Sequence, residues 1–193
     1  MDNISLVDYQ AAAAKAVRIP GLWLEFGVWK GASAEQLLKQ APDVLYGFDT
    51  FTGLPEDWRA DFPAGRFSTA GEQPKIDRLI CIAGLIQDTL PPFLMEHTEP
   101  CALVHIDTDL YSAAEFILRT LREAGRLVEG TIIMFDEIAE HPGWQDDEWK
   151  AATEQLFPYF RCIPAAARVK FKRDRPGFDD NIKCAYRLYT CKS

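Results

Sequence analysis

The 193-residue chain lacks the features of several large protein classes. It has no run of about 18 apolar residues, the length that a membrane-spanning helix requires. It also has no excess of basic residues, because its formal net charge is -8. Phosphate backbones and anionic lipids attract basic patches, so we expect neither nucleic acid nor a membrane as a partner.

Paired or metal-binding cysteines are absent as well. The chain has five cysteines, an odd number, and none has the CxxC spacing of a zinc or redox site. We interpret them as reduced thiols of a cytoplasmic protein. The start, MDNISLVDYQ, carries no basic segment and the helical AAAAKAV after it is too short for a signal sequence, so we expect no targeting peptide.

Apolar runs alternate with helical segments along most of the chain, which is typical of βαβ units around a parallel sheet. The final two runs alternate more regularly and flank the turn-rich segment DRPGFDDN, which predicts an antiparallel hairpin. The composition fits a single domain over residues 1–193. We therefore predict an α/β fold, a doubly wound, mostly parallel seven-stranded sheet with a C-terminal antiparallel hairpin. The expected strands are 22–26, 44–48, 79–83, 102–106, 131–135, 168–172 and 184–190, and the expected helices are 32–40, 112–124 and 146–157.

Acidic residues follow two of these runs. CALVHI ends at Asp107, with Asp109 just beyond it, and GTIIMF ends at Asp136 and Glu137. Neighbouring strands lie about 5 Å apart, so four carboxylates would crowd one end of the sheet. Like charges raise one another's pKa unless a cation or a proton intervenes.

A divalent metal is one such cation, and a positively charged cofactor is the other. Mg²⁺ prefers oxygen ligands and would lower the pKa of a substrate hydroxyl. In an extended segment Asp107 and Asp109 point the same way, so we predict a metal site of Asp107, Asp109, Asp136 and Glu137. The alternative is an acidic rim that is solvated or bonded to loop amides.

The end of the first strand, EFGVWKG, indicates a ligand near the backbone. Gly27 and Gly31 allow close approach, the following helix offers free N–H groups, and Glu25 is an acceptor for an amine or hydroxyl. The segment is not GxGxxG, and a tight turn is the alternative. Asp49 follows the second strand, where α/β nucleotide-binding folds hold an acid against ribose hydroxyls.

Weaker signals lie in the loops. Phe51 is placed to flank an adenine or to pin its loop, and Gly84 and Asp88 are placed to bind a base edge or to cap a short helix. His141 is placed for acid–base chemistry, although HPG is also a turn. His105 lies within an apolar strand, where a core histidine is the better interpretation. The Pro-rich and Gly-rich segment 50–74 is a long loop of the kind that is usually functional or mobile.

Taken in order, LEFGVWKGASA, YGFDTFTGLPEDW, GLIQDTLP, LVHIDTDLYSA and GTIIMFDE resemble the class I S-adenosylmethionine-dependent methyltransferases, and specifically the macrocin O-methyltransferase (TylF-like) family. The resemblance implies a cofactor cradle of Glu25, Gly27, Gly31 and Ser33, with Asp49 on the ribose and Gly84, Leu85 and Asp88 near the adenine. Phe51 and Asp107 complete the set expected at the cofactor. It also implies a divalent metal on acids matching Asp107 or Asp109 and Asp136 with its successor, and a DxD carboxylate as base.

The chain departs from that family in two places. Glu137 stands where the family usually has a second Asp, and only about 20 residues precede the first strand, so the family's acceptor is not transferable.

We predict an S-adenosylmethionine-dependent O-methyltransferase acting on a hydroxyl of a small molecule such as a sugar or secondary metabolite, with Mg²⁺ as a candidate aid. Asp107, Asp109 and His141 are the expected catalytic residues, and the sequence does not decide whether Asp107 or Asp109 is the base. The alternatives are a nicotinamide-dependent oxidoreductase, although GxGxxG is missing, and a non-catalytic cofactor-binding protein. The sequence does not decide the oligomeric state, although the aromatic-rich segments around Trp23, Trp144 and Tyr159 leave room for a homodimer face.

Overall fold

The parallel half of the sheet forms as the apolar runs predict. The computed structural model describes residues 6–41, 43–139, 141–165, 169–171 and 181–190. The parallel strands are β1 (Leu22–Phe26), β2 (Leu45–Asp49), β3 (Leu79–Ala83), β4 (Cys101–Ile106) and β5 (Ile132–Ala139), in the order β3-β2-β1-β4-β5. β1 and β4 are buried along their whole length, as expected of strands covered by helices on both faces.

The C-terminal part of the sheet is antiparallel. β8 (Asn181–Thr190) pairs with β5, and both β6 (Phe160–Pro164) and β7 (Val169–Phe171) pair with β8. Because β6 faces residues 186–190 and β7 faces residues 181–183, the two short strands follow each other along the same edge of β8. The predicted hairpin is confirmed as β7 and β8, whereas β6, an irregular FRCIP run, was not predicted.

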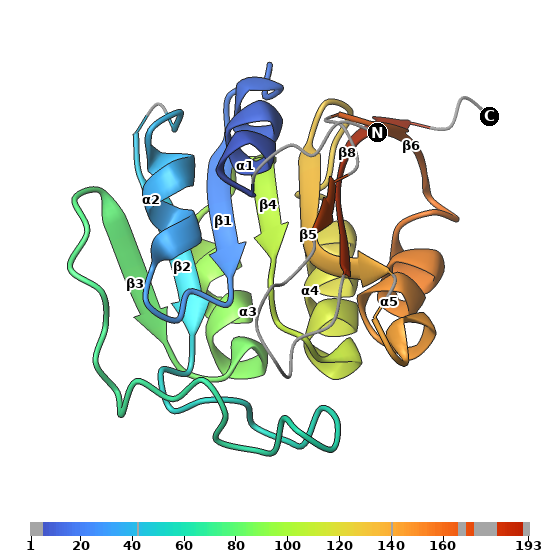
Figure 1. Cartoon of the computed structure of the whole chain (residues 1–193). Coiled ribbons are helices and arrows are strands. Elements are labelled where there is room, and N and C mark those ends of the chain that lie inside the picture. Colours follow the sequence, from blue (N-terminus) through green and yellow to red (C-terminus); the bar gives the residue numbers. More distant parts are fainter. Residues whose placement is uncertain (1–5, 42, 140, 166–168, 172–180, 191–193) are drawn as a thin grey trace.

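Helices cover both faces of the sheet (Figure 1), which confirms the doubly wound prediction. α1 (Leu6–Lys15) and α2 (Ala32–Leu38) contact each other, and their buried residues pack with β1 and β4 residues such as Trp23 and Leu103. α3 (Ile86–Glu96), α4 (Tyr111–Glu123) and α5 (Glu148–Gln155) pack with the alternate residues, such as Leu24 and Val104. The period-two alternation of a strand thus divides the core in two. No helix of the described part is long and apolar enough to cross a membrane.

α3 was not predicted as a full helix, because Pro91 and Pro92 lie inside it. Proline removes a helical N–H and disfavours a helix interior. Here Leu90, Phe93 and Leu94 are buried against the sheet, so tertiary packing outweighs the local cost.

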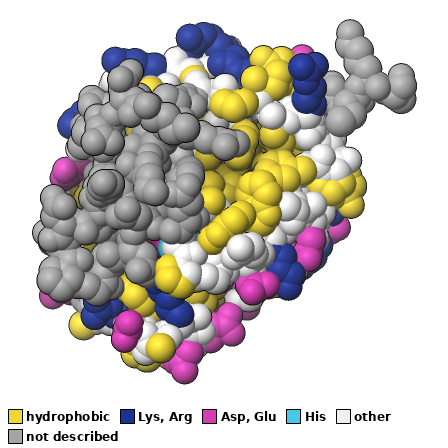
Figure 2. All heavy atoms as spheres, turned by 45° about the vertical axis from the view of Figure 1, so that its right-hand side comes forward, with side chains coloured by type: hydrophobic (Ala, Val, Ile, Leu, Met, Phe, Trp, Pro, Cys, Tyr) yellow, Lys and Arg dark blue, Asp and Glu magenta, His cyan; other side chains and the backbone are white. Residues whose placement is uncertain are grey.

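The expected dimer face is only partly exposed. Trp23 is buried in the core, with 3% of its surface exposed, so it does not contribute to any surface. Tyr159 is 48% exposed, and Figure 2 shows hydrophobic side chains gathered on the face that comes forward from the β6 and α5 end. Dimerisation stays a prediction.

The carboxyl ends of β1 and β4 approach each other closely at Gly27. Its backbone has φ +89°, and a Cβ placed there would lie 1.8 Å from the carbonyl oxygen of Asp107. Only glycine fits, because both the conformation and the space exclude a side chain. Gly27 therefore sets how closely Asp107 lies to the end of β1.

We expect Gly27→Ala to lower the free energy of unfolding by about 3 kcal/mol or more, since it combines backbone strain with a clash against backbone. Gly125→Ala is the matched control: Gly125 has φ +68°, but a Cβ placed there would meet nothing within 4 Å, so strain alone should cost about 1–2 kcal/mol. Urea titration of both variants measures the difference, and equal losses would contradict the close-approach argument.

Candidate active site

A cavity of about 770 Å³ opens at the carboxyl ends of the parallel strands, where ligands bind in open α/β sheets. Of the predicted site residues, those that line it are Gly27, Ser33, Asp49, Leu85, Asp107, Asp109, Asp136 and Glu137. The predicted site residues that are not among its lining residues are Glu25, Gly31, Phe51, Gly84, Asp88 and His141. The structure thus brings together segments from most of the chain, and it separates residues that face the cavity from residues that support its wall.

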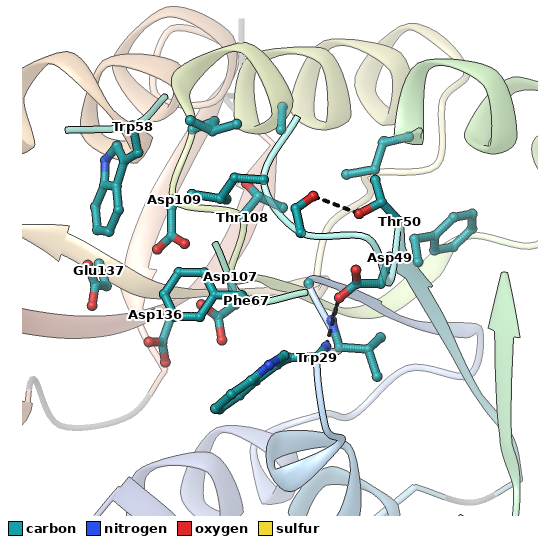
Figure 3. A pocket seen from close by; sticks show the side chains of 18 of the residues that line it. Trp29, Asp49, Thr50, Trp58, Phe67, Asp107, Thr108, Asp109, Asp136 and Glu137 are labelled. Carbon is teal, nitrogen blue, oxygen red and sulfur yellow. Dashed lines mark hydrogen bonds between the residues drawn. The ribbon is translucent and has the colours of Figure 1, made fainter. Parts of the chain in front are cut away.

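Asp49 organises one side of the cavity (Figure 3). Its Oδ2 accepts hydrogen bonds from the backbone N–H groups of Val28 (2.8 Å) and Trp29 (2.7 Å), and its Oδ1 accepts one from Phe51 (2.7 Å). The carboxylate therefore ties the loop after β1 to the end of β2. The two carboxylate oxygens offer about four acceptor sites and these bonds use three of them, so Asp49 retains the capacity to accept a further bond, at Oδ1, from a ligand's hydroxyl group.

Glu25 lies behind the cavity wall instead of facing the cavity. Its side chain is fully buried, and Oε1 lies 3.0 Å from Nδ1 of His105, which is also fully buried. Burial lowers the pKa of His105, but the Glu25 hydrogen bond and the charges of Glu25, Asp107 and Asp136 outweigh it, so the pKa is raised overall. His105 is therefore the core histidine expected from sequence, and its contact with Glu25 favours its protonated form.

The remaining residues outside the lining have structural partners. A Cβ on Gly31 would meet the side chain of Ile76 at 2.4 Å, and one on Gly84 would meet Thr89 at 2.9 Å. Phe51 is buried, with 1% of its surface exposed, which agrees with the interpretation that it pins its loop. Asp88 lies in the first turn of α3, a position where an acid stabilises a helix.

His141 lies behind the site. Its ring nitrogens are 3.2 Å from the carbonyl oxygens of Pro142 and Glu137, and its ring packs edge-on against Trp58. It is 3% exposed. This geometry suits a residue that supports the turn after β5; a role in proton transfer stays a prediction.

The predicted cluster of acids forms. Asp107 and Asp109 after β4 and Asp136 and Glu137 of β5 all line the cavity and lie on the same side of it in Figure 3. The expected extended path between the first two is wrong, because Asp109 has φ +62°. A left-handed residue of this kind turns the chain, so Asp109 faces the cavity from a bend and not from a continued strand.

Burial and mutual repulsion act strongly on this cluster. Burial raises the pKa of Asp107 well above its usual value, and the charge of Asp136 raises it further. Behind the cluster, Glu148 of α5 is 1% exposed and accepts a hydrogen bond from the backbone N–H of Glu137 at 3.2 Å. Burial, and then the charges of Asp107 and Asp136, raise the pKa of Glu148 well above its usual value.

Lys183 supplies a cation to the cluster, and it was not predicted as a site residue. Its Nζ donates a 2.9 Å hydrogen bond to the carbonyl oxygen of Asp136 and forms an ion pair with Oδ2 of the same residue. Only 1% of the Lys183 side chain is exposed. A lone lysine at the start of a predicted edge strand carries no sequence signal of a site, because its partner lies 47 positions earlier in the chain.

The long loop and the loop after β1 together form an aromatic wall. Trp29 and Phe67 pack with ring centroids 5.9 Å apart, and Trp58 and Phe62 pack at 5.0 Å. The indole N–H of Trp58 donates to Oδ2 of Asp147 at 3.0 Å, which fixes the loop to the segment before α5. All four rings line the cavity.

Lys183 competes with a divalent ion such as Mg²⁺ for the cluster. Carboxylate oxygens are suitable donors, and one ligand atom each of His105, Asp107 and Asp136 lie within 4.8 Å of one another. However, Asp136 already binds an ammonium. Repulsion between that ammonium and a divalent ion about 4 Å away would cost about 8 kcal/mol at an effective dielectric constant of about 20, which offsets part of the attraction of the carboxylates.

Comparisons with known proteins point to one family. A family described as a methyltransferase domain matches residues 24–138, more than half of the chain. No curated protein matches the chain.

Solved structures of O-methyltransferases are similar in fold. CalS11, a TDP-rhamnose 3'-O-methyltransferase of calicheamicin biosynthesis, has a TM-score of 0.63 at 22% identity. The match covers 94% of this chain and 78% of the CalS11 chain. The O-methyltransferase NovP has a TM-score of 0.61 at 17% identity, with coverages of 94% and 78%. An O-methyltransferase from Bacillus cereus in complex with SAH has a TM-score of 0.55 at 15% identity, with coverages of 95% and 82%.

We expect Asp49→Asn to lower the free energy of unfolding by about 1.5–3 kcal/mol, because an amide replaces one acceptor oxygen with an N–H donor opposite a backbone N–H. Asp77→Asn is the control, since that side chain is 98% exposed and should change stability by about 0.5 kcal/mol or less. Denaturant titration measures both, and an unchanged midpoint for Asp49→Asn would show that its three bonds do not hold the loop.

Proposed function

The chain belongs to the methyltransferase domain family matched by residues 24–138, and on that premise we propose that it transfers a methyl group from S-adenosylmethionine to a hydroxyl oxygen of a small molecule. One observation carries the proposal. A single cavity joins the Asp49 loop, which offers hydrogen-bond acceptors, to an acidic cluster that faces an aromatic wall. A nicotinamide oxidoreductase is not retained, because the family is that of methyltransferases.

The cofactor would occupy the half of the cavity near Asp49. Gly27, Ser33 and Leu85 line this half together with Trp29. The carboxylate of Asp49 would accept a bond from a ribose hydroxyl at Oδ1, and Leu85, which is 43% exposed, would cover the adenine. The sulfonium is a cation, so an acidic cavity favours it electrostatically.

The acceptor would occupy the half near the aromatic wall. Trp58 and Phe62 offer apolar ring faces, while Asp109 and Glu137 offer acceptors for hydroxyl groups. This combination suits a small polyhydroxylated molecule, and we propose a sugar or a sugar-bearing secondary metabolite. The structural likeness to CalS11, a TDP-rhamnose 3'-O-methyltransferase, and the sequence resemblance to the TylF-like family support the same choice.

The reaction is an in-line displacement. The acceptor oxygen forms a bond to the methyl carbon, the bond from that carbon to sulfur breaks, and the electron pair of that bond stays on sulfur, which leaves a neutral thioether. Most of the rate would come from holding donor and acceptor in line. The hydroxyl proton goes to Asp109, which faces the cavity from its left-handed bend, whereas Asp107 has a carboxylate oxygen within 4.8 Å of ligand atoms of His105 and Asp136.

We expect Asp109→Asn to lower kcat by about 10²- to 10⁴-fold, the usual contribution of a general base, with little change in affinity for S-adenosylmethionine. Asp61→Asn, an exposed acid of the long loop, is the matched control and should retain activity. The measurement is adenosylhomocysteine release over a panel of sugars and other hydroxyl compounds, with calorimetry for cofactor binding. Absence of cofactor binding by the folded wild type would overturn the proposed function.

The raised pKa of Asp107 predicts a pH-dependent preference for the charged cofactor. Below that pKa the carboxyl is neutral, and above it the anion attracts the sulfonium. The ratio of the S-adenosylmethionine affinity to the adenosylhomocysteine affinity should therefore increase with pH, over a range above the ordinary carboxyl pKa. Calorimetric titrations of both ligands provide the test, and Asp107→Asn should flatten the ratio. A flat ratio in the wild type would contradict the prediction.

A further inference from the structure

Lys183 reaches the acidic cluster from the antiparallel part of the sheet. Strand β8 pairs with β5 through Phe135 and Cys184, and the register then shifts between Phe135 and Ala139. An irregularity of this kind changes the direction of nearby side chains and leaves some carbonyl groups without a hydrogen bond to the neighbouring strand. The Nζ of Lys183 binds both the carbonyl oxygen and the carboxylate of Asp136 at this point.

A row of buried charges therefore crosses the floor of the cavity. Glu25 of β1 lies opposite His105 of β4, and these two side chains are in contact. Asp107 and Asp136 directly follow the paired residues Ile106 and Phe135, and Lys183 ends the row. Glu25 forms the other end of the row, so the two central acids lie between the His105 imidazole and the Lys183 ammonium.

We propose, on the basis of the methyl transfer proposed above, that the Lys183 ammonium takes the place of a divalent metal in this cleft, so that transfer proceeds without Mg²⁺. The side chain of Lys183 is 1% exposed and that of Asp136 is 11% exposed, so the ion pair belongs to the interior. A surface lysine would exchange its partner for water. Here the cation stays on Asp136 and binds Oδ2, one of the carboxylate oxygens that a metal ion would need.

Lys183 is a positioning residue in this proposal. It neutralises Asp136 and holds its carboxylate at the cavity floor, next to Asp107. It forms and breaks no covalent bond: the methyl group passes from sulfur to the acceptor oxygen, and the proton passes from that oxygen to Asp109. Neutralisation of Asp136 leaves the other acids to attract the sulfonium without the full repulsion of the cluster.

The first test uses the wild-type protein and Mn²⁺ as the probe. We expect electron paramagnetic resonance titration to detect no saturable Mn²⁺ site, with or without adenosylhomocysteine, and EDTA to leave methyl transfer unchanged. A saturable Mn²⁺ site that is lost in Asp136→Asn, or a loss of transfer in EDTA that Mg²⁺ restores, would overturn the proposal.

The second test removes the cation. In Lys183→Met the acids should gain a saturable Mn²⁺ site, transfer should fall at least tenfold, and Mg²⁺ should restore part of it. Lys183→Arg keeps the charge and should bind no Mn²⁺, and Lys150→Met, which removes an ammonium that packs on Tyr111, should behave as the wild type. If folded Lys183→Met also binds no Mn²⁺, Lys183 does not exclude the ion and the proposal fails.

These outcomes are separable from the proposed function. The Mn²⁺ titrations need neither an acceptor nor turnover, so they decide the role of Lys183 even if no acceptor is found. A failure to bind S-adenosylmethionine would overturn the methyl transfer and leave the Mn²⁺ result intact. If Lys183→Met does not fold, the wild-type measurements still decide the question.

Discussion

The repulsion among carboxylates at the ends of β4 and β5 is the constraint on which the rest of the site depends. Asp107, Asp109, Asp136 and Glu137 line one cavity, and such a group is stable only when cations or protons offset part of its charge. The structure contains both kinds of compensation. Lys183 binds Asp136, and burial raises the pKa of Asp107 so that a proton is retained more readily.

The fold produces this arrangement through strand order and strand period. β4 lies between β1 and β5, so the acid after β4 meets both neighbours. Residues two apart share a face of the sheet, which places His105 beneath Asp107 on the face covered by α1 and α2. The close approach at Gly27 then fixes the end of β1 against the Asp107 carbonyl. Backbone geometry thus brings the acidic side chains together, and a compensating cation and proton lower the repulsion among them.

The sequence predicted what depends on local pattern. Apolar runs located β1 to β5, and the acids that end two of those runs located the cavity floor. The partners across the sheet could not be predicted, because nothing local shows that Glu25 turns to His105 or that Lys183 turns to Asp136. The sequence predicted an extended backbone at Asp109, because no sequence feature reliably indicates that an aspartate has a positive φ. The full length of α3 was not predicted, because Pro91 and Pro92 disfavour a helix interior and the stability of α3 comes from tertiary packing.

The charge balance of the proposed transfer links these features to function. Before transfer the sulfonium carries one positive charge and the Asp109 carboxylate one negative charge. Afterwards the thioether and the protonated acid are both neutral, so an ion pair disappears within a partly enclosed cavity, where charges are costly to keep. The Lys183 and Asp136 pair does not change during this exchange. A cation that belongs to the protein therefore keeps the remaining acids in place through the whole cycle, whereas the cation of the cofactor is consumed in each turnover.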